Sequence, residues 1–506
     1  MSSRVDNSLR NVKFAMIFQV VILVLGFVTR WVFIAILGEE YLGFTVAFGS
    51  IFAVLSLAEA GMGAALVFHM YDPIARGDEQ KIATLVHIFK KAYTYIAIIV
   101  LVIGIGLTPF LRLLITDIPD HPNLHLIYIL FIIHSVMAYM FAHQQALITA
   151  NQKEYVISQY RMIFNIVLNV LKIAFLIITR NFIVFLLIQI TMAFATNSFI
   201  GKIGQQMYPF LKTVKPKKLE PDEKTALITS FKAMLMHKFG TVFVLQTDGF
   251  IMAALIGWHI TSLYANYILI VASVQTFVDS VFRAILASVG NVGATQNNDN
   301  LEEYFKKVNF CGFWLATVTS ICVFFLTNPF ITLIFDETLL LPTYVVAVIA
   351  LNFFLLSMRR SVLTFRDALG IFDKDRFKPI FEAIVNISAT IFLGIHFGIA
   401  GVLLGTTVNT IFVCMTVEPY VVYKFGLKKP LKNYYFILLQ HVGVAGLIVA
   451  ALYFTVGIFA SGGLVNFLIL SVFVFVIINV ILLIIYWRSS EFKYFYNILL
   501  RRLKRN

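Results

Sequence analysis

Charged and carboxamide side chains recur inside apolar segments that are long enough to cross a membrane. A charge at membrane depth is costly unless it faces water or a partner, so such residues usually mark a polar cavity. At the helical repeat, those within each of four segments share one helical face. The stripes comprise Gln19 and Arg30 in 14–37; Arg161, Asn165, Asn169 and Lys172 in 157–179; His237, Thr241 and Asp248 in 227–256; and Asn352, Arg359 and Arg366 in 342–369.

The stripes contain more cations than acids, and this excess indicates an anionic ligand. The planar guanidinium of Arg matches the geometry of phosphate oxygens, and Lys supplies a point charge. We therefore predict a substrate-binding cavity, and Asp248, Glu59 and His237 are the candidates for binding a coupling ion or for holding an Arg in place. The predicted cavity residues are Arg30, Lys172, Arg359, Arg366, Asn165 and Asn169.

Structural roles are the alternative for several of these residues. Arg30 lies near the predicted outer end of its helix, from which a long side chain can reach the interface. Asp248 could pair with an Arg, and Glu59 could pack between helices. Arg359 and Arg360 are adjacent, so at most one of them should face the cavity centrally.

The helices that must position these residues follow from composition. The chain has 506 residues, of which 60% are hydrophobic and 13% charged, whereas soluble domains average about 25% charged. A spanning helix needs roughly 20 mostly apolar residues. We therefore predict an all-α integral membrane protein of about fourteen transmembrane helices. Their approximate ranges are 14–37, 43–69, 89–111, 124–148, 157–179, 182–208, 227–256, 261–290, 304–335, 342–369, 378–397, 400–425, 431–458 and 464–487.

The basic residues predict the orientation of these helices. With the N-terminus in the cytosol, only Arg112 and Arg180 of the 40 Lys and Arg residues fall in outer connections, and five lie within helices. The other 33 fall on the cytosolic side, as the positive-inside rule requires. Both termini are therefore predicted to be cytosolic. The net charge of +14 is attributed to orientation and to contact with anionic membrane lipids, not to binding nucleic acid.

An internal repeat predicts the domain organisation. Arg30 and Asp248 are 218 residues apart, and Asn165 and Asn386 are 221 apart. This nearly constant offset spans six crossings and therefore predicts two parallel-repeat six-helix lobes, with a substrate site between them. The predicted parts are an N-terminal lobe (1–210), a cytosolic linker (211–226), a C-terminal lobe (227–427), and a helix pair with a basic cytosolic tail (428–506).

Several short stretches of the chain form a recognisable series by their order and spacing. They are Leu37-Gly38-Glu39-Glu40-Tyr41-Leu42-Gly43 after Arg30, Glu59-Ala60-Gly61-Met62-Gly63, Met70-Tyr71-Asp72-Pro73, His237-Lys238-Phe239-Gly240, Thr247-Asp248, Phe365-Arg366-Asp367-Ala368-Leu369-Gly370, Lys378-Pro379 and Glu418-Pro419. Over roughly residues 10–425 the chain thereby resembles bacterial polysaccharide repeat-unit flippases, the Wzx-like branch of the multidrug/oligosaccharidyl-lipid/polysaccharide exporter superfamily.

The resemblance implies a flippase of the bacterial plasma membrane. Its substrate would be an oligosaccharide repeat unit on undecaprenyl pyrophosphate, moved from the cytosolic to the outer leaflet for capsule or exopolysaccharide assembly. An ion gradient or the membrane potential would drive transport, and the pyrophosphate would meet Arg30, Lys172 and Arg359 in succession. Polysaccharide polymerase and chain-length proteins are the implied partners.

Three other functions compete with this one. A peptidoglycan-precursor flippase of the same superfamily would share every physical argument. A drug/cation antiporter should have acids dominating its cavity. A membrane-embedded enzyme of glycan assembly should expose a long acidic loop, and the chain has none. We find no phosphate-binding loop for ATP and no spacing of His and Cys typical of a metal site, so we predict neither a cofactor, nor a metal, nor an enzyme.

Overall fold

The long apolar runs of the sequence form long helices. The computed structural model describes residues 21–55, 62–115, 118, 123–139, 142–151, 153–295, 298–371, 374–456 and 463–503, and every regular element within these ranges is helical. Ten helices of the described part are long and apolar enough to cross a membrane, and Val21–Leu37 and Glu40–Ala53 are shorter apolar helices. The chain is therefore an all-α, multi-pass membrane protein, as its composition predicts.

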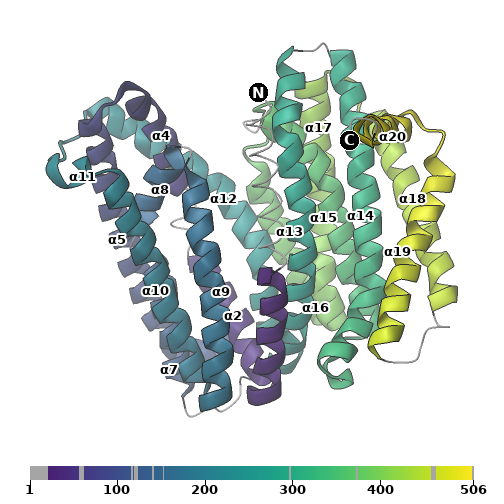
Figure 1. The fold of residues 1–506 in the computed structure, drawn as a ribbon, viewed down its shortest axis with the longest axis horizontal. Coiled ribbons are helices and arrows are strands. Elements are labelled where there is room, and N and C mark those ends of the chain that lie inside the picture. Colours follow the sequence, from purple (N-terminus) through teal and green to yellow (C-terminus); the bar gives the residue numbers. More distant parts are fainter. Residues whose placement is uncertain are drawn as a thin grey trace. The chain divides into compact units, whose positions relative to one another are not determined.

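Two compact units divide the chain at Ser262, and Figure 1 shows the helices of each. The predicted lobes are divided elsewhere, at the linker 211–226. Their boundaries remain a prediction. Unit 1 contains the helix Val21–Leu37, α2 (Glu40–Leu55), α4 (Met62–Arg76), α5 (Glu79–Leu107), η1 (Thr108–Phe110), α6 (Leu111–Leu114), α7 (Leu124–Tyr139), α8 (Ala142–Ala150), α9 (Glu154–Thr179), α10 (Phe182–Met207), α11 (Phe210–Thr213) and α12 (Pro221–Leu255).

The remaining helices lie almost wholly in unit 2, which begins within α13. These are α13 (Trp258–Thr295), α14 (Asn298–Ile334), η2 (Glu337–Leu339), α15 (Thr343–Ala368), α16 (Lys378–Asn409), η3 (Thr410–Cys414), α17 (Met415–Val421), η4 (Val422–Leu427), α18 (Lys432–Val456), α19 (Leu464–Tyr486) and α20 (Ser490–Leu503). The short elements η3 and η4 are π-helical and flank α17.

The described helices overlie the fourteen predicted ranges but differ from them at several ends. Hydropathy finds only the apolar part of a helix, so the predicted start at residue 89 falls ten residues after the true start of α5 at Glu79. The C-terminal tail also contains a helix, α20, that the basic composition did not predict. One long segment, Lys378–Leu427, covers two predicted spans because it bends at Gly398, where φ is +60°.

The predicted linker 211–226 is fastened to α5 in unit 1. The backbone amide of Lys217 donates to the Thr84 hydroxyl over 3.0 Å. Nearby, Lys81 forms an ion pair with Glu223 at the start of α12. Polar contacts therefore hold this lysine-rich segment at one end of the unit.

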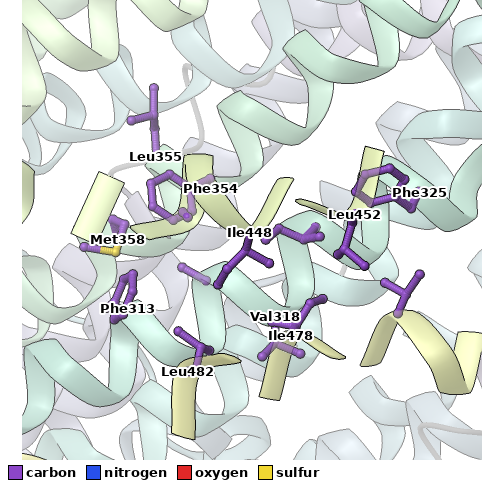
Figure 2. Packing of buried hydrophobic residues seen from close by; sticks show 14 of the residues in the cluster. Phe313, Val318, Phe325, Phe354, Leu355, Met358, Ile448, Leu452, Ile478 and Leu482 are labelled. Carbon is purple, nitrogen blue, oxygen red and sulfur yellow. The ribbon is translucent and has the colours of Figure 1, made fainter. Parts of the chain in front are cut away.

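Helices α18 and α19 pack on α14 and α15 through a core of aliphatic and aromatic side chains. Phe313 and Met358, from α14 and α15, are fully buried in this cluster, and so are Ile478 and Leu482 of α19. Figure 2 shows these side chains interleaving with Ile448 and Leu452 of α18. The C-terminal helix pair is thus an integral part of unit 2.

Candidate functional site

The polar stripe of α9 is contacted by neighbouring helices along much of its length. The hydroxyl of Thr29, next to Arg30 in sequence, donates to the side-chain oxygen of Asn169 over 3.0 Å. The Asn169 amide in turn donates to both the backbone and side-chain oxygens of Asn165, each at 2.8 Å. These bonds join the helix Val21–Leu37 to α9 and bring Arg30 into the same polar region as Lys172.

Lys172 is held by groups that do not neutralise it. Its ammonium donates to the Gln189 side chain over 2.7 Å and lies 4.5 Å from the centre of the Phe185 ring. Both residues lie on α10. Gln189 is also 3.4 Å from His134 of α7. The position of Lys172 is therefore fixed by a carboxamide and an aromatic ring, neither of which carries a negative charge.

Arg30 and Lys172 are close enough to repel one another electrostatically. One guanidinium nitrogen of Arg30, Nη1, is buried without a hydrogen-bond partner in the structure. Within the described part of the chain, neither cation contacts a carboxylate. Because a buried unpaired charge is costly, this arrangement is suited to receive an anion that supplies the missing acceptors.

The carboxamides continue toward the other end of α9. Arg161 hydrogen-bonds to Gln145 of α8, and the Gln145 amide donates to Asn197 of α10 over 3.0 Å. Sequence reasoning missed Gln189, Gln145 and Asn197. Each is a carboxamide within an apolar segment long enough to cross a membrane. A polar side chain in such a segment was the signal by which the sequence could have revealed them.

In unit 2, Arg359 belongs to a buried cluster of opposite charges. Its guanidinium donates to both oxygens of Glu418, at 3.0 and 2.7 Å, and lies 3.6 Å from Glu382. Lys378 contacts both of these acids, and the Cys414 thiol donates to Glu382 over 2.9 Å. Two cations thus face two carboxylates, so Arg359 is neutralised in this structure.

Sequence reasoning missed this cluster, although its signal was present. Lys378 and Glu382 are one helical turn apart on α16, and Glu418 is an acid inside an apolar stretch. Glu418 has no exposed surface, and it lies in α17 between the two π-helical turns. π-Helical turns are rare in proteins, and those that occur often lie at functional sites.

The other predicted site residues form ion pairs, are half-buried, or are not described by the structure. Arg366 is paired with Asp367 and Asp375, each at 2.9 Å. Asp248 is half-buried on α12. Glu59 lies outside the described residues, and of His237 only the position of its backbone within α12 is described. The structure therefore gathers Arg30, Lys172, Asn165 and Asn169 in unit 1, whereas Arg359 and Arg366 lie in unit 2.

Comparison with solved structures identifies the fold. The lipid II flippase MurJ, in an inward closed conformation, superposes with a TM-score of 0.62 at 15% identity, over 94% of this chain and 99% of its own. An inward-facing multidrug resistance MATE family transporter of the MOP superfamily gives 0.60 at 12% identity, over 81% of this chain and 98% of its own.

The chain has the fold of these transporters. A further MATE structure, in complex with MaD3S, superposes with a TM-score of 0.53 at 13% identity, over 82% of this chain and 95% of its own. No protein-family profile and no curated protein sequence matches the chain. The similarity is therefore one of architecture, and function must be argued from the site.

Proposed function

We propose that this protein is a flippase for undecaprenyl-pyrophosphate-linked oligosaccharide repeat units. It moves them from the cytosolic to the outer leaflet of the bacterial plasma membrane for assembly of a capsule or exopolysaccharide. Two of the proteins that share its fold are a lipid flippase and a multidrug transporter. Transport proceeds by alternating access and is driven by an ion gradient or the membrane potential, without enzymatic chemistry.

The observation that carries this proposal is the uncompensated pair of cations in unit 1. Arg30 and Lys172 repel each other, and the structure describes no carboxylate in contact with either. A diphosphate would relieve the repulsion and satisfy Arg30 Nη1, since charge-assisted hydrogen bonds to phosphate are among the stronger ones. An organic cation would be repelled, which argues against a drug/cation antiporter.

The carboxamides beside these cations suit the sugar part of the substrate. Asn165 and Asn169 of α9 offer both donors and acceptors, which is what sugar hydroxyls require. We assign to Asp248, Glu59 and His237 the roles of coupling or ion-pair candidates. Arg359 and Arg366 would have to exchange their carboxylate partners before binding substrate. Polymerase and chain-length proteins are the expected partners, and anionic lipids the expected surroundings.

A peptidoglycan-precursor flippase is the second candidate, and the fold comparison is equally consistent with it. The superposition on the lipid II flippase covers 94% of this chain, whereas the inward-facing MATE transporter covers 81%. The substrate in the name of that flippase, lipid II, is a lipid-linked molecule, as is the substrate of the first candidate. Both candidates predict a polyprenyl diphosphate substrate and differ in the attached glycan.

Deleting the gene and analysing lipid-linked intermediates in each leaflet tests the proposal. Complete repeat units should accumulate on the cytosolic leaflet, and wild-type protein should clear them. Accumulated lipid II would select the second candidate. A lipid-linked glycan that stops one sugar short would contradict both, because it would identify an enzyme of assembly.

A further inference from the structure

The adjacent residues Arg359 and Arg360 of α15 have opposite environments. Consecutive residues of a helix point about 100° apart, so the two guanidinium groups face different neighbours. The side chain of Arg359 is 10% exposed and pairs with a fully buried Glu418. The side chain of Arg360 is 30% exposed and pairs with Asp279 of α13, which is itself 25% exposed. Arg360 is thus the more accessible of the two cations.

The ion pair of Arg360 with Asp279 leaves one guanidinium donor unused. Its Nη2 donates to Asp279 Oδ2 over 3.1 Å, whereas its Nε lies 2.9 Å from Oδ1 but is buried without a hydrogen-bond partner. A guanidinium presents the same two-pronged face to a phosphate as to a carboxylate. Asp279 also accepts a hydrogen bond from the Gln275 amide over 2.8 Å. The carboxylate would therefore keep a partner if the guanidinium left it.

Among the described residues, the charges around Arg360 leave one cation in excess. Asp279 and Arg283 act on it from α13, Arg359 from its own helix, and Glu418 from α17. Arg359 and Glu418 neutralise each other. Within the described part of the chain, the exposed Arg283 and the partly exposed Arg360 are then balanced by the one carboxylate of Asp279, which pairs with Arg360. An added anion would find an unbalanced positive charge here, unlike in the buried cluster of Arg359.

We infer that Arg360 is a diphosphate-binding residue of unit 2 and that Asp279 occupies its guanidinium until the substrate displaces it. The inference rests on the proposed function, because the displacing anion is the diphosphate of the translocated lipid. It assigns the second-unit role to Arg360, whereas Arg359 holds α15 to α16 and α17. A partly exposed ion pair is weak enough for such an exchange, whereas a buried one is not.

Binding of geranylgeranyl diphosphate to the full-length protein in lipid nanodiscs tests this inference. Arg360→Gln should weaken binding about tenfold, the usual effect of removing one charge-assisted contact. Asp279→Asn should tighten it about threefold or more, because the internal competitor is gone. Arg488→Gln, which removes an exposed arginine beside Trp487, is the charge-matched control and should leave binding unchanged. Binding of inorganic pyrophosphate, which is the head group alone, and of geranylgeraniol, which is the tail alone, should be measured in the same way. The two results separate recognition of the head group from recognition of the tail.

The two substitutions distinguish exchange from a structural ion pair. If the pair only stabilises the fold, both changes will weaken binding or neither will alter it, and the inference is overturned. Because misfolding cannot tighten binding, the Asp279→Asn result is decisive even if Arg360→Gln unfolds. Wild-type protein that binds no diphosphate would instead refute the proposed function. Binding that is weakened by Arg30→Gln but not by Arg360→Gln would refute the inference alone.

Discussion

At the scale of the residue, Arg30 is a half-buried cation whose Nη1 is buried without a hydrogen-bond partner. Arg30→Gln should abolish export of polysaccharide without lowering the amount of protein in the membrane. The reason is that the change removes a ligand for the anion and no hydrogen bond or ion pair within the described part of the chain. Export and membrane abundance should be measured together. Lys202→Gln, which removes an exposed cation from α10, should export normally. Normal export by the Arg30 variant would remove this residue from the mechanism.

Glu418 illustrates the opposite role of a charge, namely that of holding helices together. Glu418→Gln would leave Arg359 and Lys378 buried with only Glu382 to balance them. Breaking a buried pair in this way costs about 3–5 kcal/mol, so thermal unfolding in detergent should move to clearly lower temperature. Asp367→Asn is the matched change in a pair whose carboxylate is 51% exposed, and it should cost less than about 1 kcal/mol.

A double variant checks that the loss at Glu418 comes from the ion pair. Arg359→Gln combined with Glu418→Gln removes one cation and one anion together. It should recover part of the lost stability, because residues in one network do not act additively. Equal unfolding temperatures for the double variant and the worse single variant would contradict the assigned role of the pair.

At the scale of the element, the bend in α16 depends on glycine. Gly398 has φ +60° and ψ −141°, a region open essentially to glycine alone. After the bend the chain returns so closely that a Cβ on Gly401 would lie 1.9 Å from the Leu393 carbonyl oxygen. Backbone must therefore move to admit any side chain. Gly401→Ala should lower the unfolding temperature and the yield of folded protein, as followed by fluorescence-detected gel filtration.

Gly443 of α18 provides the control for this substitution. A Cβ there would meet no atom within 4 Å, and alanine is favoured over glycine in a helix interior by about 1 kcal/mol. Gly443→Ala should therefore be neutral or slightly stabilising. Equal destabilisation by the two changes would show that the close return of the chain at Gly401 does not matter.

At the scale of the whole molecule, the distribution of Lys and Arg predicts the topology. Green fluorescent protein fused to the C-terminus should fluoresce, because it folds in the cytosol. Alkaline phosphatase fused after Asn181, which joins α9 to α10, should be active, since that connection is predicted to lie outside. An active phosphatase at the C-terminus would reverse the orientation and, with it, the proposed direction of transport.

Much of the fold was predictable because membrane helices are local. Each must satisfy its backbone hydrogen bonds internally and bury about 20 apolar residues, so hydropathy locates them one by one. The break at Gly398 and the polar face of α9 are local as well. The extension of α5 back to Glu79 and the helix α20 were not found, because polar helices outside the hydrocarbon region carry no such signal. The six-helix repeat stays a prediction.

The sequence by itself thus predicted the apolar helices, their orientation and the polar stripe that contains Asn165, Asn169 and Lys172. Only the tertiary structure decided which charges are neutralised. Arg359 and Arg360 are neighbours in the chain, yet one meets Glu418, 59 residues away, and the other meets Asp279, 81 residues away. Ion pairing depends on distances of a few ångströms between separate helices. Periodicity within one helix contains no information about those distances.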